Sequence, residues 1–397
     1  MKPIFKTLLR FSLGIVLTLA GLLLAVVIYF SIVYSPEYVR RSFFVGEATV
    51  YDYLKLPSRP LTASPIAFHF SEQPDEELVR ASFEANPKVG NLEDFLTRTG
   101  TQAFIVIRND AILYEKYFNG AKRDSQVVSF STAKSFTSAL IGIAIQEGAI
   151  QSENDPITDY LPELATRDAR FQKITINDLL AMASGIRFDE KRFMWHDESN
   201  LTYRFPDLRS LALNKTIIIE PPGQTFIYND YNLILLGMIL ERATGTPVTD
   251  YLQEKLWTPL GMEFGGTWTL DSDSTRFELM SCCINAHAID FAKFGRLYLN
   301  NGSWNGKQIV PAAWVAKSTR VDQGRKLDDT MSYGLLWWEK PRMDEPNDFL
   351  AWGNFGQFIY VSPTRNLLIV RNGEKYGLPA EGAEWADIFH QFATALH

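Results

Sequence analysis

The sequence is short of the residues from which disulfide frameworks, metal sites and nucleic-acid surfaces are built. Its 397 residues include two cysteines and five histidines. Cys282 and Cys283 are adjacent, and because a bond between neighbouring residues is strained and rare, we expect two buried or unpaired thiols. The histidines show no HExxH or other ligand spacing, so we expect no metal and no other cofactor. A net charge of −7 without a long basic block excludes an electrostatic footprint for nucleic acid.

Charge is also missing from one long stretch near the N-terminus. Residues 11–34, FSLGIVLTLAGLLLAVVIYFSIVY, carry no charge and exceed the roughly 20 residues that a helix needs to cross a bilayer. A secretory signal has a shorter apolar core and a cleavage site of small residues, and neither pattern occurs here. We therefore predict that residues 1–34 form an uncleaved, single-pass membrane anchor.

Basic residues before the anchor indicate its orientation. Lys2, Lys6 and Arg10 precede the apolar run and favour a cytoplasmic N-terminus, although Arg40 and Arg41 on the other side reduce the asymmetry. The remainder of the chain is then expected on the extracytoplasmic, periplasmic side.

The rest of the chain divides into a connector and a globular domain. Residues 35–90 are rich in proline, but their aromatic content is too high for a free linker, so we expect an arm that is ordered in part. In the domain, residues 91–397, β-rich runs flank Asn109-Asp110 and predict a hairpin. Helical patterns ending on glycine fill residues 150–320, and strands return after them. Strands at both ends with helices between predict an α+β fold whose sheet joins distant parts of the chain.

A serine followed three residues later by a lysine begins a helix that is apolar on nearly every side. Residues three apart share a helix face, so the side chains of Ser131 and Lys134 can meet. Serine is inert until a base takes its proton, and lysine is a base only when neutral, which burial favours. The alternative is a serine N-cap with Lys134 pointing outward. The spacing alone fits both interpretations, and the apolar helix favours the catalytic pair.

Five blocks of sequence carry a family resemblance. In chain order they are FSTAKSFTSALIG, ITINDLLAMASGI, PPGQTFIYNDYNLILLGMILERATG, AIDFAKFGRLYLNNGSWNGKQIVPAAWV and AWGNFGQFIYVSP. They resemble the SxxK family of serine β-lactamase-related hydrolases, which includes class C β-lactamases, DD-peptidases, certain esterases and 6-aminohexanoate-dimer hydrolases. The resemblance implies a β-lactamase/transpeptidase-like fold: an antiparallel sheet flanked by helices and a mostly helical lobe, here preceded by one transmembrane helix.

The resemblance also implies roles for individual residues. Ser131 corresponds to the acyl-accepting nucleophile and Lys134 to its proton partner. Tyr228 in the tyrosine box would pass protons to the leaving group. Asp230 stands where many relatives have asparagine, and it is a candidate for the substrate pocket.

The third box departs from the family pattern. Relatives that act on β-lactams or peptide C-termini have a lysine or histidine there, which meets the substrate carboxylate. This chain has Ala351-Trp352-Gly353 and no cation, which more closely resembles the 6-aminohexanoate-dimer hydrolase and esterase branches. The resemblance implies an oxyanion hole formed by the backbone N–H groups of Ser131 and Asn354. Trp352 and Gly353 are candidate pocket residues, and a packed core position for Trp352 is equally open.

Other residues fit parts of a catalytic pattern less well. Tyr117 and Tyr298 match the bare Tyr-x-Asn pattern of the family's tyrosine box. They lie in the hairpin and near a helix end, so we expect them to be structural. A Ser-His-Asp triad using His287 and Asp290 is a second possibility, and the chain lacks the G-x-S-x-G elbow that would support it.

These observations predict a membrane-anchored serine hydrolase that cleaves a small-molecule ester or amide through an acyl-enzyme on Ser131. Two alternatives remain open. One is a catalytically silent binding protein on the same fold, for which the altered third box and Asp230 argue. The other is a β-lactamase or DD-peptidase acting on cell-wall-type substrates. The sequence carries no signal for an oligomeric state.

Overall fold

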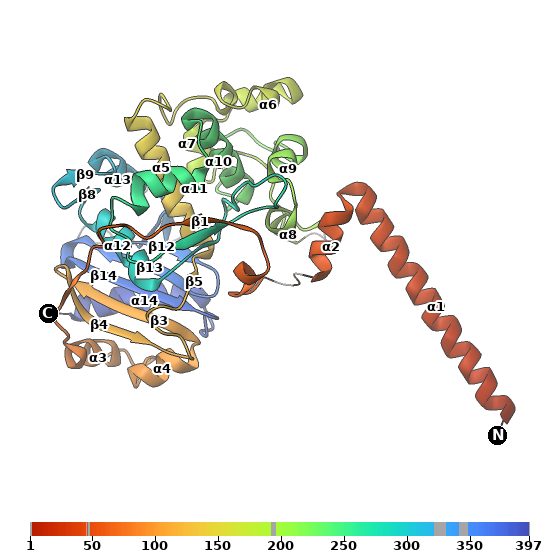
Figure 1. The fold of residues 1–397 in the computed structure, drawn as a ribbon, viewed down its shortest axis with the longest axis horizontal. Helices are drawn as coiled ribbons and strands as arrows, with labels where there is room; N and C mark the ends of the chain where they lie inside the picture. The colour runs from red at the N-terminus through yellow and green to blue at the C-terminus, as the bar shows by residue number, and fades with distance from the viewer. Residues whose placement is uncertain are drawn as a thin grey trace. The chain divides into compact units, whose positions relative to one another are not determined.

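The computed structural model describes residues 2–44, 46, 48–191, 196–320, 331–340 and 348–396. The chain divides into two compact units, one of residues 1–48 with 189–206 and the other of residues 49–188 with 207–397 (Figure 1). Residues 49–90, the larger part of the expected connector, therefore belong to the second unit.

The first unit consists of the N-terminal helix and the segments that pack near its end. Helix α1 (Lys2–Val33) contains the predicted apolar run, and its 29 residues Phe5–Val33 are long and apolar enough to cross a membrane, as an anchor or a signal sequence. Helix α2 (Pro36–Phe44) follows and contacts α8 (Glu198–Arg204). The Tyr34 hydroxyl lies 2.8 Å from His196 Nδ1, and the Tyr38 ring lies 5.8 Å from that of Phe205.

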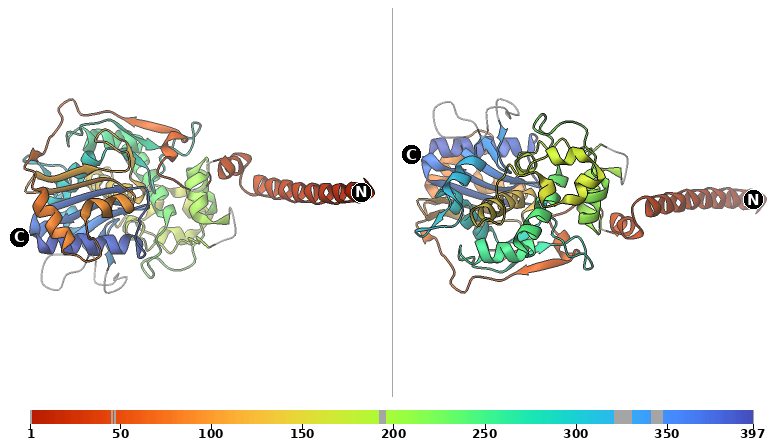
Figure 2. Two further views of the ribbon diagram at one scale, coloured as in Figure 1. Left: turned by 90° about the horizontal axis from the view of Figure 1, so that it is seen from below. Right: turned by 90° about the horizontal axis from the view of Figure 1, so that it is seen from above.

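The second unit is built on a sheet that joins both ends of the domain. Among the described residues, eight strands follow the order β10-β11-β12-β13-β14-β3-β4-β2. Neighbouring strands are antiparallel, except for the parallel pair β2 and β4. The pairing of β3 with β14 places the start of the domain beside its end, as predicted (Figure 2). The strands are β2 (Ser71–Glu72), β3 (Thr101–Arg108), β4 (Ala111–Tyr117), β10 (Ser332–Tyr333), β11 (Trp338–Lys340), β12 (Asp348–Gly353), β13 (Gln357–Ser362) and β14 (Leu367–Gly373).

The turn between β3 and β4 confirms the predicted hairpin. Asn109 and Asp110 have φ angles of 54° and 60°. Two-residue hairpin loops of this kind need a positive φ at both positions, which asparagine and aspartate tolerate better than most residues.

Helices cover both faces of the sheet. Helix α12 (Ala288–Leu299) contacts β13, β14 and β3, and it approaches closely because a Cβ on Gly295 would lie 2.4 Å from Leu368 Cδ1. A hydrophobic cluster joins the sheet to α3 (Glu76–Glu84), α4 (Leu92–Arg98) and α14 (Glu381–Ala395). Figure 1 shows the blue α14 beside the strands of the sheet.

The middle of the chain is largely helical, as predicted. Helix α5 (Ala133–Gln146) is buried from Ala133 to Ala144 and packs against α10 (Asp230–Thr244). The other helices are α6 (Pro162–Arg167), α7 (Ile176–Leu180), α9 (Leu208–Lys215), α11 (Val248–Leu252) and α13 (Ala312–Ser318). A smaller sheet has the order β1-β6-β7-β5, from β1 (Ser58–Leu61), β5 (Val127–Val128), β6 (Gly266–Thr269) and β7 (Ile284–Ala286), and β8 (Ser303–Trp304) pairs with β9 (Lys307–Gln308).

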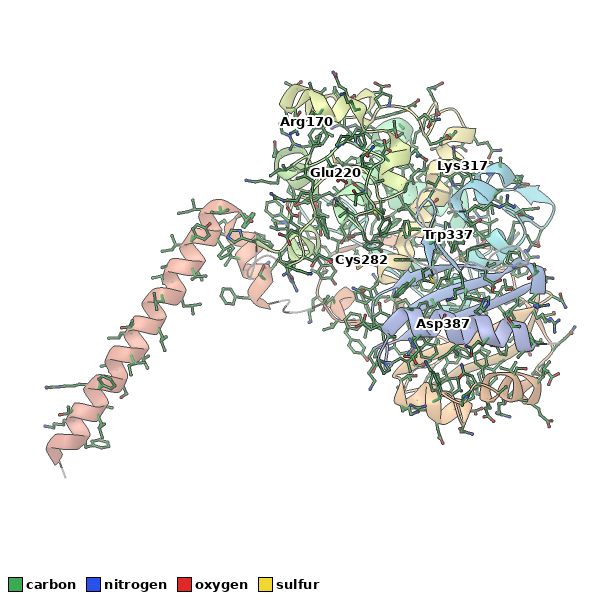
Figure 3. The ribbon with its side chains drawn as sticks, turned by 180° about the vertical axis from the view of Figure 1, so that it is seen from behind. Arg170, Glu220, Cys282, Lys317, Trp337 and Asp387 are labelled. Carbon is green, nitrogen blue, oxygen red and sulfur yellow. A yellow bond between two sulfur atoms is a disulfide. The ribbon has the colours of Figure 1, made fainter. Side chains whose placement is uncertain are left out.

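Of the expectation of two buried or unpaired thiols, the burial is confirmed and the thiol state is wrong. Cys282 and Cys283 form a disulfide in the loop before β7, and Cys282 is labelled in Figure 3. Both side chains are buried. Cys283 adopts a φ of 78°, which is a left-handed conformation. The sequence pattern does not predict this backbone conformation, in which the sulfur atoms of the two neighbouring residues are bonded.

We therefore expect both cysteines to resist alkylation when the protein is unfolded without a reductant. After treatment with a dithiol reductant, the unfolded chain should take up two labels, because it has two cysteines. Mass spectrometry of the alkylated protein measures this. Labelling without reduction would show that the thiols are free.

Candidate active site

The expected nucleophile lies in a short turn directly before the central helix. Ser131 belongs to a 3-10 turn over Phe130–Thr132, so the α-helix itself begins at Ala133 and not at the serine. Neither Ser129 nor Thr132 caps this helix with its side chain. Phe130 has a φ of 42°, which is uncommon for a bulky residue and gives the chain a sharp turn before Ser131. The N-cap alternative therefore has no support in the structure.

Lys134 points inward and is surrounded by oxygen atoms. Its side chain is 2% exposed, which rules out the outward-pointing alternative. Nζ lies 2.8 Å from Ser131 Oγ and 2.7 Å from the carbonyl oxygen of Ser281. It also forms an ion pair with Asp230, at 3.0 Å from Oδ1.

The electrostatics of Lys134 differ from the sequence-based expectation. Burial favours the neutral amine, as the sequence analysis assumed. However, the Asp230 carboxylate and Tyr228 outweigh this effect, and together they raise the pKa of Lys134 above its usual value. The ion pair with Asp230, which the sequence pattern did not predict, is the physical reason for the difference.

The tyrosine box meets the lysine from the start of α10. Lys134 Nζ lies 4.8 Å from the ring centroid of Tyr228, over its face. Between Tyr228 and Asp230, the side chain of Asn229 accepts a hydrogen bond from the Tyr231 N–H and donates one to the Ile186 carbonyl oxygen. This buried residue fixes the N-terminus of α10. The segment therefore presents the residues on both sides of Asn229 to the lysine.

The third box lies against the nucleophile turn. A Cβ on Gly353, the last residue of β12, would be 2.3 Å from the Ser129 carbonyl oxygen and 3.0 Å from the Ser131 backbone nitrogen. Only glycine allows this approach. Asn354 follows in the turn to β13, and among the described residues neither its N–H nor that of Ser131 donates a hydrogen bond. Two backbone donors therefore remain available at this side of the site.

Trp352 faces the other way. Its ring packs on Gly382 of α14, where a Cβ would lie 1.9 Å from Cζ2. Its Nε1 donates a hydrogen bond to the Tyr376 hydroxyl at 3.0 Å, and its ring lies 4.9 Å from that of Trp338. Successive residues of a strand point to opposite faces, so Trp352 projects away from the face that meets Ser131. Trp338 in turn stacks beside Tyr228, with ring centroids 6.0 Å apart.

Two buried side chains that the sequence analysis missed hold the turn after the third box. Arg371 donates to the Gly356 carbonyl oxygen at 2.7 Å and lies 4.0 Å from the ring centroid of Trp385, and burial lowers its pKa to about 9. Gln357 donates from Nε2 to the Asn354 carbonyl oxygen at 3.3 Å. Arg371 reaches this turn from β14, and both side chains donate to backbone carbonyl groups, which leave no motif in the sequence.

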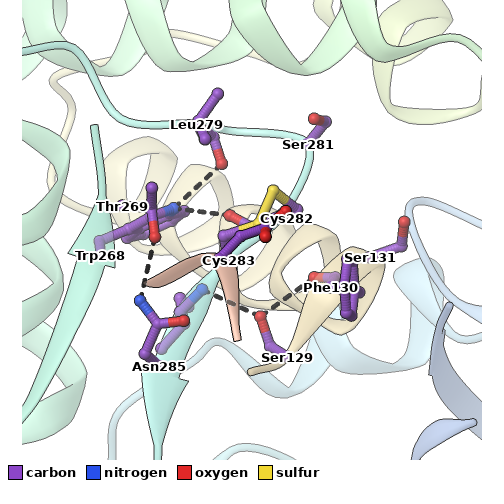
Figure 4. Close-up of a disulfide and its surroundings, with 12 residues drawn as sticks. Ser129, Phe130, Ser131, Trp268, Thr269, Leu279, Ser281, Cys282, Cys283 and Asn285 are labelled. Atoms are coloured by element: carbon purple, nitrogen blue, oxygen red, sulfur yellow. Dashed lines mark hydrogen bonds between the residues drawn. A yellow bond between two sulfur atoms is a disulfide. The ribbon is translucent and has the colours of Figure 1, made fainter. Parts of the chain in front are cut away.

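The loop that carries the disulfide forms another wall of the site. The Ser281 carbonyl oxygen, which meets Lys134, directly precedes Cys282. Beyond the disulfide, the Ile284 N–H donates to Ser129 Oγ at 3.0 Å (Figure 4). Trp268 Nε1 donates to the Cys282 carbonyl oxygen at 2.9 Å. The loop is therefore tied to the nucleophile turn on one side and to the smaller sheet on the other.

The residues of the competing triad have other partners. His287 Nε2 lies 3.1 Å from the Asp124 carbonyl oxygen. Asp290 accepts hydrogen bonds from the backbone of Glu263 and pairs with Lys293 at 3.0 Å. In the part of the chain that the structure describes, Ser131 Oγ has its hydrogen bond with the lysine and none with a histidine.

The other residues of the sequence analysis lie outside this arrangement. The Tyr117 hydroxyl donates to Glu115, and Tyr298 is buried with its ring 4.4 Å from that of Trp337. Within the described ranges, no group of three or more His, Cys, Asp or Glu side chains is placed to hold a metal ion.

Gly353→Ala tests the close approach of β12 to the nucleophile turn. The added Cβ would meet a backbone oxygen at 2.3 Å, so the strand or the turn must shift. We expect a loss of about 1–3 kcal/mol in the free energy of unfolding. Chemical denaturation measures it, with Gly21→Ala as the matched control because no atom lies within 4 Å of a Cβ there. Equal stability of the two variants would contradict this packing.

Comparison with known proteins bears on the family and the fold of the chain. The Beta-lactamase family model matches residues 91–388. The 6-aminohexanoate-dimer hydrolase of Paenarthrobacter ureafaciens is 28% identical over 315 residues, which cover 75% of this chain and 78% of that protein. Among solved structures, a Bacillus anthracis protein provisionally named 6-aminohexanoate-dimer hydrolase has a TM-score of 0.71 at 24% identity, covering 87% of this chain and 93% of that one. A family VIII carboxylesterase has a TM-score of 0.60 at 19% identity, with 83% and 98% covered. The structural likenesses establish the β-lactamase/transpeptidase-like fold.

Proposed function

The chain belongs to the beta-lactamase family, and on that premise we propose that it is a membrane-anchored serine hydrolase that cleaves an ester or amide through an acyl-enzyme on Ser131. The proposal rests on the 2.8 Å contact between Lys134 Nζ and Ser131 Oγ, in which the buried lysine is surrounded by polar groups. A serine hydroxyl gains nucleophilicity only from an adjacent base, and lysine is the one basic side chain in contact with it among the described residues.

The proposed reaction has two stages. In the first, neutral Lys134 takes the Ser131 proton while Oγ attacks the substrate carbonyl, and the N–H groups of Ser131 and Asn354 receive the oxyanion. The bond to the leaving group then breaks, and Tyr228 passes a proton to the departing oxygen or nitrogen. In the second stage, water attacks the acyl-serine ester, its proton returns through the same groups, and the carboxylic acid product leaves Ser131 free.

The substrate is proposed from what lines the site. Ala351 occupies the position where relatives that act on β-lactams have a cation, and Lys134, the basic side chain that contacts Ser131, is already paired with Asp230. A substrate carboxylate would lack a partner there. Aromatic side chains gather nearby instead, with Trp338 between Tyr228 and Trp352. The names of two similar proteins, a 6-aminohexanoate-dimer hydrolase and a carboxylesterase, support small amides and esters.

The location is proposed from the N-terminal helix and the disulfide. Residues Phe5–Val33 form a helix that is long enough to anchor the chain, and the basic residues before it favour a cytoplasmic N-terminus. The hydrolase domain would then lie outside the cytoplasm. The disulfide between Cys282 and Cys283 supports that side, because disulfides persist in oxidising compartments.

Labelling by a fluorophosphonate probe tests the nucleophile. We expect a covalent adduct that Ser131→Ala abolishes and that Lys134→Met slows by a factor of about 100 or more, since it removes the base. Ser135→Ala is the matched control, because Ser135 lies in the same helix and donates to the Leu336 carbonyl oxygen. Its labelling should be unchanged.

The alternatives give different labelling results. An absence of Ser131-dependent adduct would favour a silent binding protein. Loss of labelling in His287→Ala, together with normal labelling in Lys134→Met, would favour the Ser-His-Asp triad.

Substrate profiling tests the missing cation. We expect turnover of p-nitrophenyl acetate to exceed that of a chromogenic cephalosporin, because the carboxylate of the cephalosporin has no cationic partner in the third box. Initial rates with both substrates, with Ser131→Ala as the blank, provide the comparison. Rapid cephalosporin hydrolysis with the acetate left untouched would favour the β-lactamase or DD-peptidase alternative.

A further inference from the structure

A carboxylate sits in this site at a position where many relatives have an amide. Asp230 is the first residue of α10, and its side chain is 20% exposed. Its Oδ1 lies 3.0 Å from Lys134 Nζ, which is almost completely buried. An ion pair that is largely shielded from water is weakly screened, so this carboxylate acts strongly on the charge of its partner.

The three oxygen atoms around Lys134 Nζ are not equivalent. The Ser281 carbonyl oxygen and the Asp230 carboxylate can only accept hydrogen, whereas the Ser131 hydroxyl can also donate. Nζ donates hydrogen bonds to Ser131 Oγ and to the Ser281 carbonyl oxygen, whereas its contact with Asp230 is an ion pair in which Oδ1 accepts no hydrogen bond from the described residues. A neutral amine can still donate to the Ser281 carbonyl oxygen, which can only accept, and can turn its lone pair to the Ser131 hydroxyl, which can donate. The proton between Nζ and Oγ is therefore the one that must leave before the lysine can act as a base.

Few other titratable groups face this lysine. Tyr228 presents its ring at 4.8 Å from Nζ, and Tyr333 of β10 lies behind it with ring centroids 6.1 Å apart. Within the described residues, Asp230 is the carboxylate at ion-pair distance from Nζ. The charge state of Lys134 is therefore set mainly by burial, by Asp230 and by Tyr228.

We propose that Asp230 is a positioning residue that holds Lys134 as an ammonium at neutral pH, with Nζ next to Ser131 Oγ. Acylation then begins only as the pH rises above neutral. This inference rests on the proposed function. Aspartate at a position where many relatives have asparagine would then shift acylation to alkaline pH, and its carboxylate would set the pH at which acylation begins.

The direction of the pH effect follows from the opposing contributions. Burial lowers the pKa of Lys134, and Asp230 with Tyr228 raises it above the usual value. The base form of wild type therefore appears only as the pH rises through that raised value. In Asp230→Asn an amide of the same size takes the place of the carboxylate and the negative charge is gone, so the pKa of Lys134 falls and the base form appears at lower pH.

The experiment is the pH dependence of fluorophosphonate labelling of the full chain in detergent, from about pH 6 to about pH 10. We expect the wild-type rate to rise on the alkaline side of neutral. Asp230→Asn should move this rise down by about one pH unit or more, because an opposite charge at this distance shifts a pKa by that amount. Labelling near neutral pH should then be about tenfold faster than in wild type.

Two further variants separate charge from position. Asp230→Ala removes both the charge and the polar side chain, so its rise should also move down, but its labelling should be slower than that of Asp230→Asn at each pH. Asp273→Asn makes the same change of net charge at an exposed residue and should leave the profile unchanged. Thermal unfolding of each variant checks that the chain is folded.

The outcomes distinguish this inference from the proposed function. A wild-type rise that lies below neutral pH, which needs no variant to observe, would overturn the inference. So would an Asp230→Asn profile that is uniformly slower without a shift. Absence of Ser131-dependent labelling at every pH would overturn the proposed function and the inference with it.

Discussion

The burial of one amine organises the candidate site. Lys134 lies on a helix that is enclosed along most of its length, so its Nζ can reach only groups that the fold brings to it. A buried polar group without partners is costly, and three oxygen atoms from separate parts of the chain satisfy this one. The nucleophile turn, the N-terminus of α10 and the loop before β7 must therefore all pack around the start of α5.

The sheet contributes the other half of the site. Gly353 lets β12 touch the turn that carries Ser131, and two backbone N–H groups at that contact have no partner among the described residues. Arg371 and Gln357 then fix the following turn through backbone carbonyl groups. These residues lie on β12, β13 and β14, and β14 pairs with β3 from the start of the domain. The position of the proposed oxyanion hole therefore depends on a sheet that both ends of the domain build together. The pairing of the strands therefore also positions this half of the site.

The disulfide and Asp230 both lie close to the buried amine. The bond between Cys282 and Cys283 lies one residue from the carbonyl oxygen that meets Lys134. Asp230, at the N-terminus of α10, forms an ion pair with the same lysine. Both features modify the surroundings of the amine and leave the nucleophile itself unchanged. The third box has Ala351 where many relatives have a cation, so the three departures all lie at or near the candidate site.

The sequence by itself determined the features that depend on neighbouring residues. The hairpin at Asn109-Asp110 follows from local φ preferences, and the meeting of Ser131 with Lys134 follows from their spacing. The strand patterns at both ends of the domain, with helical patterns between them, also predicted the α+β fold and the joining of its distant strands. Most of the fold and the identity of the Ser131–Lys134 contact were predictable in this way.

Only the tertiary structure decided the surroundings of that contact. The Ser281 carbonyl oxygen has no side-chain signature, the pairing of Lys134 with Asp230 joins different helices, and Trp352 turns toward α14 because of its place in a strand. For the same reason, burial alone suggested a lowered pKa for Lys134, whereas the fold supplies a carboxylate that raises it. Spacing along a chain fixes which neighbours can meet, but the charge and polarity around a buried group come from residues that only folding brings together.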